Sequence, residues 1–418
     1  MKQKQRNILM CLQKLDIGGV ETAVLTLCSG YIRKGYNVFV AAEEGIFLPQ
    51  LEKMGVKVLN IKYEFLNRFA LERQEELCNF CIENNITEIH IHQYPCVLYW
   101  LPVCAKLNIP YVAYVHSIVP GAPQWFMKDF KVHRVALPIF FEKASKIVCI
   151  AESTKNEIEE LFHIGEEHYK IIPNSLNMED FKEGKVPEKI NKFGLVSRIS
   201  EEKMLSLKNS IDLFSKYLEF NPDSELLIAG DGPLKKELES YSKNIKNIKF
   251  LGPISDVSSF LGQIDVFMGV DRCILEALAC KRLAIISSYN GNMNILNKNN
   301  IEKATKQNFS GNNLDNQDNI LECIKNITPK EYKKIVNENY LYIDKYYNVD
   351  NNLYMYELDS NFTNDYEVIF SRINEFLEEL DNKNYEISLL KEKNKTILKR
   401  MYHIIYNAMR KIYHKIFK

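Results

Sequence analysis

Two cations near one strand end could bind an anionic ligand. In LVSRISEEK, Arg198 follows a run of apolar residues and Lys203 comes five positions later. Guanidinium and ammonium groups at the end of a buried strand can converge on phosphate oxygens. Solvated surface charge is the alternative interpretation of both residues. Their position directly after a buried strand favours a binding role.

A glycine pair separates the first apolar run from the helical pattern that follows it. Gly18 and Gly19 stand between RNILMCLQKL and VETAVLTL. Missing side chains let a ligand approach the backbone, and a helix start offers free N–H groups to an anion. A tight turn would require the same two glycines, so both interpretations stay open.

Two further side chains could contact the hydroxyl groups of a ligand. Glu276 is the one carboxylate in the helical stretch RCILEALA, where it could accept hydrogen bonds from two vicinal hydroxyls of a ribose. A favourable interaction with the helix dipole is the alternative. His116 ends YVAYVHS and could contact a substrate hydroxyl, or be an ordinary satisfied polar residue. His92, at the end of EIHIHQ, is a weaker candidate of the same kind.

The elements that must position these residues are short apolar runs between helical patterns. Such runs are typical of strands buried on both faces, and their spacing leaves room for crossover helices. The predicted class is α/β, with two Rossmann-like domains over residues 1–180 and 190–345 that face an interdomain cleft. A return segment over 346–360 and a helical extension over 361–418 follow. The chemistry is expected in the crevice at the carboxyl ends of the strands.

Two later segments have unusual composition. Residues 290–318 are rich in Asn and poor in apolar residues, which predicts loops with little regular structure. The last segment, KEKNKTILKRMYHIIYNAMRKIYHKIFK, carries nine Lys or Arg against one Glu. A basic amphipathic helix of this kind can lie on an anionic membrane surface. Packing on its own protein with a solvated basic face is the alternative.

Composition and missing motifs exclude several classes. The 418 residues contain 54 Lys and Arg against 54 Asp and Glu, which argues against nucleic-acid binding by bulk charge. The ten cysteines lack metal-ligand spacing, so no metal site is predicted. No signal peptide or spanning helix is recognisable, and a cytoplasmic protein is expected. The usual marks of dinucleotide oxidoreductases, P-loop NTPases, zinc proteases and α/β-hydrolases are absent.

Taken together, the motifs resemble the retaining GT-B glycosyltransferases of the glycosyltransferase 4 type. The resemblance covers roughly residues 6–355 and depends on the order of GGVET, the strand-end His116, IPNSLNMEDF, LVSRISEEK, LLIAGDGPLKKELE, FLGPISDV and ILEALAC. It implies a nucleotide-sugar donor on the second domain and an acceptor on the first. No cofactor is implied beyond this co-substrate.

The resemblance also implies roles for individual residues. Arg198 and Lys203 would hold the donor diphosphate in place of a metal, and His116 would contact the transferred sugar. Glu276 would bind the ribose hydroxyls, and Gly18 and Gly19 would let the loop approach the donor. Asp271 and Arg272 complete the predicted donor site, where Asp271 would put negative charge near the diphosphate unless Arg272 neutralises it.

Three positions depart from the family pattern. Met268 stands where the family has a second glutamate, eight positions before Glu276, and it cannot hydrogen-bond a sugar hydroxyl. Asp271 replaces a glycine of Gly-Phe-Gly, and Lys281 stands where a glycine usually follows Ala-Cys. These departures leave the donor sugar open.

The leading hypothesis is a metal-independent enzyme that adds a sugar to a glycan or lipid-linked glycan in cell-surface polysaccharide synthesis. Trp125, Phe126 and Met127, interleaved with Lys128, Lys131 and Arg134, favour a lipid-linked acceptor, although they could equally be core residues of a long loop. The alternative function is a non-catalytic GT-B subunit that binds and stabilises a partner transferase.

Overall fold

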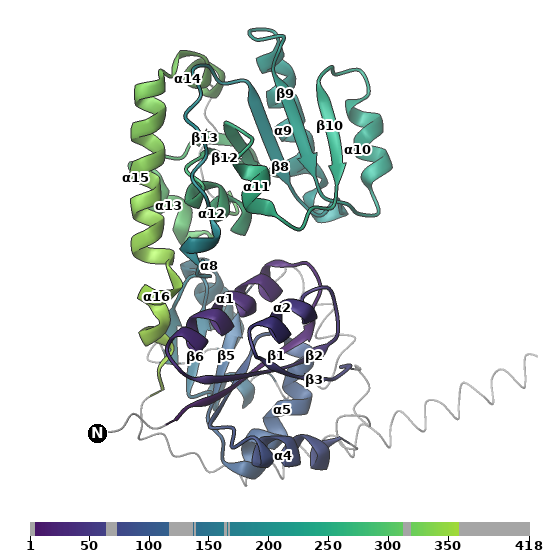
Figure 1. Cartoon of the computed structure of the whole chain (residues 1–418), viewed down its shortest axis with the longest axis vertical. Coiled ribbons are helices and arrows are strands. Elements are labelled where there is room, and N and C mark those ends of the chain that lie inside the picture. Colours follow the sequence, from purple (N-terminus) through teal and green to yellow (C-terminus); the bar gives the residue numbers. More distant parts are fainter. Residues whose placement is uncertain are drawn as a thin grey trace, which may run out of the picture.

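The computed structural model describes residues 5–63, 73–116, 137, 139–162, 165, 168–311 and 319–358, except for the side chain of residue 161. Two α/β domains lie one above the other (Figure 1). Trp125 to Arg134 and the basic extension over 361–418 fall outside the described residues. The structure therefore does not test the predictions made for those two segments.

The N-terminal domain contains a seven-stranded sheet whose described pairings are all parallel. The strand order is β3-β2-β1-β4-β5-β6-β7. The strands are β1 (Asn7–Lys14), β2 (Asn37–Glu43), β3 (Lys57–Asn60), β4 (Glu88–Ile91), β5 (Tyr111–Val115), β6 (Lys146–Cys149) and β7 (Tyr169–Ile171). Described helices between them are α1 (Gly19–Arg33), α2 (Leu48–Lys53), α4 (Gln74–Glu83), α5 (Tyr94–Leu107) and α8 (Glu152–Phe162).

The C-terminal domain contains a six-stranded sheet in the order β10-β9-β8-β11-β12-β13. Its strands are β8 (Lys192–Val196), β9 (Glu225–Ala229), β10 (Ile248–Gly252), β11 (Val266–Gly269), β12 (Leu283–Ser288) and the antiparallel β13 (Gly291–Ile295). The helices are α9 (Glu201–Leu218), α10 (Lys235–Ser242), α11 (Val257–Leu261), α12 (Arg272–Ala279), α13 (Ile301–Lys306), α14 (Ile320–Asn326) and α15 (Pro329–Tyr347).

Apolar side chains explain why these runs are strands. Every residue of β5 and of β12 is buried, as expected for a strand covered by helices on both faces of a sheet. Each domain has two hydrophobic core clusters, which pack on opposite faces of its sheet. The predicted α/β class with two Rossmann-like domains is confirmed.

The Asn-rich segment is more ordered than the sequence predicts. Residues 290–318 include strand β13 and helix α13, so the prediction of irregular loops was wrong for the described residues 290–311. The reason is a small set of widely spaced apolar side chains that complete the cores, namely Met293, Ile295, Leu296, Ile301, Ala304 and Phe309. Burial of these residues outweighs the poor intrinsic preference of the surrounding asparagines.

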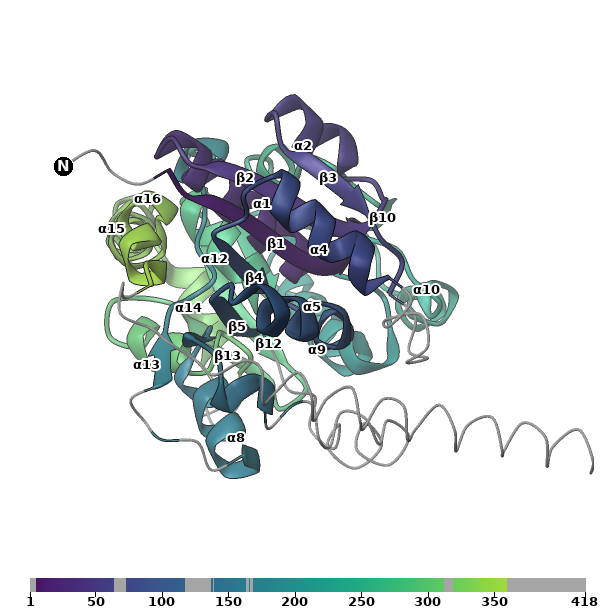
Figure 2. The ribbon, with the colours of Figure 1, turned by 90° about the horizontal axis from the view of Figure 1, so that it is seen from below.

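The chain crosses between the domains twice, and the two crossings are hydrogen-bonded to each other. The Leu176 N–H donates to Tyr347 O at 2.7 Å, and the Val349 N–H donates to Leu176 O at 2.9 Å. Helix α16 (Val349–Asn352) and the turn η3 (Leu353–Tyr356) then pack into the N-terminal core through Val349, Leu353 and Tyr356. Figures 1 and 2 show α15 and α16 following one another along the same side of the two domains.

Candidate active site between the two domains

Most of the predicted residues follow strands at the topological switch points of the two sheets, whereas His116 follows the next strand, β5. In the N-terminal sheet the order reverses at β1 and β4, and in the C-terminal sheet it reverses at β8 and β11. Open α/β sheets bind ligands outside the carboxyl ends of the strands at such points. Gly18 and Gly19 follow β1, and Arg198 follows β8.

Gly19 lies at the start of α1 and leaves open space around its Cα. A Cβ added to Gly19 would meet no atom within 4 Å, whereas one added to Gly18 would lie 2.1 Å from the Glu21 carboxylate. The Gly18 backbone is extended, which any residue can adopt. The space at Gly19 therefore serves no internal packing, and it suits close approach by a ligand.

Glu21 occupies the first turn of α1, and sequence reasoning missed it as a site residue. The Gln93 amide donates to Glu21 Oε1 at 3.2 Å, and the Gln13 N–H donates to Gln93 Oε1 at 2.5 Å. Burial raises the pKa of Glu21, while its own N–H, Gln93 and the positive charge of Arg198 act in the opposite direction. Arg198 of the second domain is thus within electrostatic range of a carboxylate of the first. Glu21 is the glutamate of the motif GGVET, so that motif could have identified it as a site residue.

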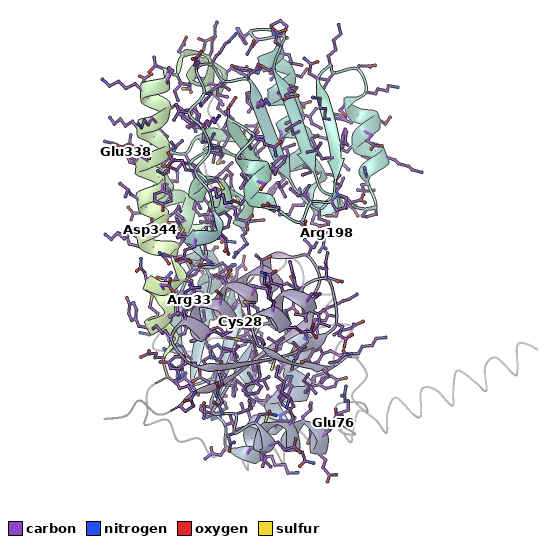
Figure 3. All side chains as sticks on the ribbon, in the orientation of Figure 1. Cys28, Arg33, Glu76, Arg198, Glu338 and Asp344 are labelled. Atoms are coloured by element: carbon purple, nitrogen blue, oxygen red, sulfur yellow. The ribbon has the colours of Figure 1, made fainter. Side chains whose placement is uncertain are left out.

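Arg198 is exposed on a loop that two glycines hold in place. The Ser197 N–H donates to Ala229 O at 3.1 Å, and the Ile199 N–H donates to Asp231 O at 2.9 Å. A Cβ on Gly230 would lie 1.9 Å from Ser197 O, and one on Gly232 would lie 2.2 Å from Ile199 O. Because Gly230 and Gly232 have no Cβ, the AGDG loop after β9 can pack directly against the loop after β8 that carries Arg198. Figure 3 shows Arg198 at the edge of its domain that faces the other domain.

Lys203 pairs with Asp271. The Lys203 Nζ lies 2.6 Å from Asp271 Oδ2, and both side chains are about one-third exposed, at 33% and 37%. Asp271 has φ 58° and ψ −141°, a conformation that strongly favours glycine. Its N–H donates to Phe309 O at 3.1 Å, which fixes the backbone there. The Asp271 carboxylate is thereby held in an ion pair with Lys203, the residue predicted to bind the donor diphosphate.

Arg272 pairs with Glu276 and not with Asp271, so the condition under which Arg272 would neutralise Asp271 is not met, and Lys203 is the cation beside Asp271. Arg272 Nε lies 3.0 Å from Glu276 Oε1, and the two residues are 9% and 8% exposed. The reason is helical geometry, because residues four apart lie on one face of α12. Burial raises the pKa of Glu276, and the charge and hydrogen bond of Arg272 act in the opposite direction.

The Arg272 guanidinium also joins the domains. Its Nη1 donates to Ser175 O at 3.3 Å in the crossing segment, and its Nη2 donates to Thr26 Oγ1 at 3.3 Å in α1. Glu276 is therefore fixed by a cation that contacts both domains. Sequence reasoning missed Thr26 and Ser175, since neither carries a charge or a recognisable motif.

His116 follows β5 near the boundary between the domains. Burial lowers the pKa of His116 to about 4, the Arg272 charge acts in the same direction, and the neighbouring Asn174 side chain opposes both. His116 Nε2 lies 3.0 Å from His92 Nδ1. The two predicted histidines are thus brought together, and the charge of Arg272 in the opposite domain acts on His116.

The departures from the family pattern have clear local structures. Met268 is fully buried in the C-terminal core, where β11 precedes α12 by only two residues. It faces no ligand. Lys281 has φ 54°, in the left-handed region that favours glycine, and its Nζ lies 2.6 Å from Glu183 Oε2. The backbone at both Asp271 and Lys281 thus retains a glycine-like conformation.

The described residues form neither a metal-binding cluster nor a membrane-spanning helix. Over these ranges, no three His, Cys, Asp or Glu side chains are grouped so that they could hold a metal ion. No helix within the described parts of the chain is long and apolar enough to cross a membrane.

Both domains match protein-family models of glycosyltransferases. Residues 17–180 match Glycosyltransferase Family 4, and residues 191–322 match Glycosyl transferases group 1. With its two-domain architecture, the chain is a glycosyltransferase of the GT-B fold.

Individual proteins are similar to this chain at low identity. An uncharacterized glycosyltransferase of Methanocaldococcus jannaschii is 24% identical over 311 residues, which is 67% of this chain and 79% of the relative. HepE of Anabaena, solved with UDP and glucose, is 17% identical with a TM-score of 0.63, over 83% of this chain and 98% of its own. A glycosyltransferase of Rickettsia africae is 14% identical with a TM-score of 0.61, over 89% and 99% of the two chains. At these identities the structures support the fold alone.

Proposed function

We propose that the protein transfers a sugar from a nucleotide-sugar donor to a glycan or lipid-linked glycan acceptor in cell-surface polysaccharide synthesis. The observation that carries this proposal is the position of Arg198. It is held by the Gly230–Gly232 loop at one switch point, at the edge of its domain that faces the other domain, and its charge acts on Glu21 at the start of α1. HepE, whose structure contains UDP and glucose, supports a nucleotide-sugar donor.

In this proposal the donor diphosphate lies against Arg198 and Lys203. A departing nucleoside diphosphate gains negative charge in the transition state, and fixed cations aimed at that charge lower the barrier. Gly19 leaves room for the donor beside α1. Asp271 must release Lys203, at least in part, when the diphosphate binds, because the two anions compete for one ammonium group.

The remaining assignments concern the two sugars of the donor. Glu276, oriented by Arg272, is assigned to the ribose hydroxyls, and His116 to the transferred sugar. Retention of anomeric configuration and independence from a metal ion belong to the proposal through the family resemblance. Residues 17–180 and 191–322 both match glycosyltransferase models, which favours an enzyme over a non-catalytic subunit.

A thermal-shift screen tests the donor assignment. The purified chain is heated with UDP, GDP or ADP and with their common sugar conjugates, and released diphosphate is measured in parallel. One base should raise the melting temperature, and one of its sugar conjugates should be consumed. If no nucleotide stabilises the chain and no diphosphate is released, the proposed function is wrong.

We further propose that the protein is cytoplasmic and is held peripherally on an anionic membrane by its basic C-terminal segment. The support is the sequence alone, with nine Lys or Arg against one Glu over residues 391–418. Truncation after about residue 385 should move the protein from the membrane fraction to the soluble fraction, since each basic residue contributes about 1 kcal/mol near such a surface. Unchanged fractionation would contradict this part of the proposal.

A further inference from the structure

The first crossing between the domains is fixed to the C-terminal domain from Lys182 onward. The Lys182 N–H donates to Ser258 Oγ at 3.1 Å, and Arg282 Nη1 donates to Lys185 O at 2.8 Å. The Arg282 guanidinium also packs against Gly184, where any Cβ would clash with it. A rotation of one domain relative to the other therefore bends the first crossing before Lys182.

The second crossing is fixed to the N-terminal domain from Val349 onward. Val349 and Leu353 are buried in the core of that domain, and a Cβ added to Gly30 of α1 would lie 2.9 Å from each of their side chains. The two crossings meet at Leu176, whose N–H donates to Tyr347 O and whose carbonyl accepts from the Val349 N–H. We expect any rotation of the domains to occur about Leu176, since hinges are short segments between rigid parts.

Arg272 lies between this hinge and helix α1. Its Nη1 donates to Ser175 O, one residue before Leu176, and its Nη2 donates to Thr26 Oγ1, both at 3.3 Å. Arg272 moves with the C-terminal domain, whereas Thr26 moves with the N-terminal domain. A contact much beyond 3.5 Å is no longer a hydrogen bond, so a small rotation is enough to break the bond to Thr26.

The hydrogen bond between Arg272 and Thr26 is buried and well oriented. The two residues are 9% and 7% exposed. The Thr26 hydroxyl donates to Thr22 O at 2.9 Å, which leaves its oxygen free to accept from Arg272. A hydrogen bond to a charged group contributes more than one between neutral groups, and a buried N–H that loses its acceptor is costly. Breaking this bond therefore disfavours rotation.

An exposed ion pair that also joins the domains is a weaker contact. Lys306 of α13 lies 3.7 Å from Glu152 of α8, and the two side chains are 56% and 48% exposed. Exposed pairs of this kind contribute little to stability. The arrangement of the domains consequently depends more on the buried bond of Arg272.

We propose that the hydrogen bond between Arg272 and Thr26 holds the donor-free protein in the domain arrangement that binds the nucleotide-sugar donor. This inference rests on the proposed function for the identity of the ligand. Thr26 is then a positioning residue, because its hydroxyl is already used by Arg272 and Thr22. A protein whose binding-competent arrangement is only partly populated binds its ligand more weakly by that fraction, so the bond raises donor affinity.

Small-angle X-ray scattering of the full-length, ligand-free protein tests the arrangement directly. Thr26→Val removes the hydroxyl and nearly keeps the side-chain volume, so the domains should separate and the radius of gyration should exceed that of wild type. Thr26→Ser keeps the hydroxyl and should match wild type. An unchanged radius of gyration in Thr26→Val would overturn the inference, whether or not any nucleotide binds.

Ser242→Ala is the matched control for the bond that Thr26 makes within its own helix. Ser242 is 4% exposed, and its hydroxyl donates to Leu238 O at 3.1 Å, four residues earlier in α10. Ser242→Ala should leave the radius of gyration and the donor affinity at wild-type values. Changes as large as those of Thr26→Val would assign the effect to the helix and overturn the inference.

Donor affinity provides a second readout. Calorimetric titration uses UDP-glucose and, if it does not bind wild type, GDP and ADP sugars. Thr26→Val should weaken binding roughly tenfold, the factor expected for one hydrogen bond to a charged group. Saturating donor should return the radius of gyration of Thr26→Val to the wild-type value, which a purely structural defect would not allow. Wild-type affinity in Thr26→Val would contradict the inference.

A double substitution tests whether Thr26 acts through Arg272. Arg272→Lys keeps a cation beside Glu276 but cannot donate to all three partners. In that background Thr26→Val should change neither the radius of gyration nor the affinity further, because residues in one contact are not additive. Fully additive effects would overturn the inference. A wild-type protein that binds no nucleotide would instead refute the proposed function, and scattering would still decide the role of Thr26.

Discussion

Lys203 Nζ lies 2.6 Å from Asp271 Oδ2, although the backbone at Asp271 is one that strongly favours glycine. A carboxylate is thus held, at a cost in backbone strain, against a cation that we assign to the donor diphosphate. Nucleotide binding must replace this internal anion with an external one. The pair is therefore expected to weaken donor and product binding, not to strengthen it.

Substitutions of Asp271 should separate the effect of its strained backbone on stability from the effect of its negative charge on nucleotide binding. Asp271→Gly relieves the strained φ and removes the competing carboxylate, so the free energy of unfolding should rise by about 1 kcal/mol. The affinity for the nucleoside diphosphate should rise roughly tenfold, equivalent to about 1.4 kcal/mol. Thermal unfolding and calorimetric titration with UDP measure the two effects.

Asp271→Asn is the matched control for the charge. It keeps the side-chain volume and nearly the same backbone preference but not the negative charge, so it should raise nucleotide affinity without a comparable gain in stability. Weaker binding in both variants would mean that Asp271 contacts the ligand favourably, which contradicts the competition described above.

The contact between two strand-end loops should make Gly230 and Gly232 indispensable. Gly230→Ala and Gly232→Ala each place a methyl group against a backbone carbonyl oxygen, at 1.9 and 2.2 Å. The loop that carries Arg198 must then move, and we expect a loss of about 2 kcal/mol or more in stability, together with loss of nucleotide binding. Gly252→Ala is a suitable control because φ is +74° there but no atom lies within 4 Å of the added Cβ. It should lose only about 1 kcal/mol.

Gly19→Ala should affect the ligand and spare the fold. The added methyl group would enter open space at the start of α1, so the free energy of unfolding should change by less than about 0.5 kcal/mol. Donor binding should weaken at least tenfold if the donor lies against this turn. Gly262→Ala, whose added Cβ meets only ordinary contacts at 3.6 Å, should change neither quantity. Unchanged donor affinity in Gly19→Ala would show that Gly19 only forms a turn.

The buried pair of Arg272 and Glu276 should matter more than an exposed pair of similar geometry. Arg272→Ala leaves the Glu276 carboxylate buried without its cation, which should cost about 3–5 kcal/mol in the free energy of unfolding. The exposed pair of Arg73 and Glu76, 2.6 Å apart, is the control. Arg73→Ala should lose less than about 1 kcal/mol. The double variant Arg272→Met with Glu276→Leu should be more stable than Arg272→Ala, and the opposite order would contradict this explanation.

Stability should fall as the pH is lowered through the titration range of His116. Its pKa is about 4 in the folded protein, below the unfolded value near 6.5, so the unfolded chain binds the proton first. The contribution is fully present above about pH 6.5 and is lost toward pH 4, by up to about 3 kcal/mol. His116→Gln should flatten this part of the stability profile, measured by urea unfolding at a series of pH values. A profile identical to that of wild type would contradict the assignment.

Much of the fold could be predicted because its strands are continuous apolar runs. The runs RNILMCLQKL, EIHIHQ, YVAYVHS and KFGLVSRIS, for example, contain the strands β1, β4, β5 and β8. Two strands were missed for physical reasons. β7 has only three residues, two of them exposed, and β13 lies in an Asn-rich segment whose few apolar side chains alternate into the core.

The site could be predicted only in part. Position after a buried strand was enough to single out Arg198 and His116, since parallel strands end at one edge of a sheet. The partner of Lys203 lies 68 residues away in sequence, so only the sheet order reveals it. Whether Arg272 neutralises Asp271 was left open, although the four-residue spacing to Glu276 already indicated its partner. The contacts of Arg272 with Thr26 and Ser175 depend on how the domains meet, which no local pattern encodes.

The central claim is that Arg198 binds the diphosphate of a nucleotide-sugar donor, and a calorimetric titration tests it most directly. Wild type, Arg198→Ala and Lys192→Ala are titrated with UDP and, if UDP does not bind, with GDP and ADP. Lys192 is the matched control, because it is an exposed cation at the opposite end of the same strand, β8. We predict that one nucleotide binds wild type and Lys192→Ala equally and binds Arg198→Ala at least tenfold more weakly. Equal affinity for all three proteins, or no binding of any nucleotide to wild type, would contradict the claim.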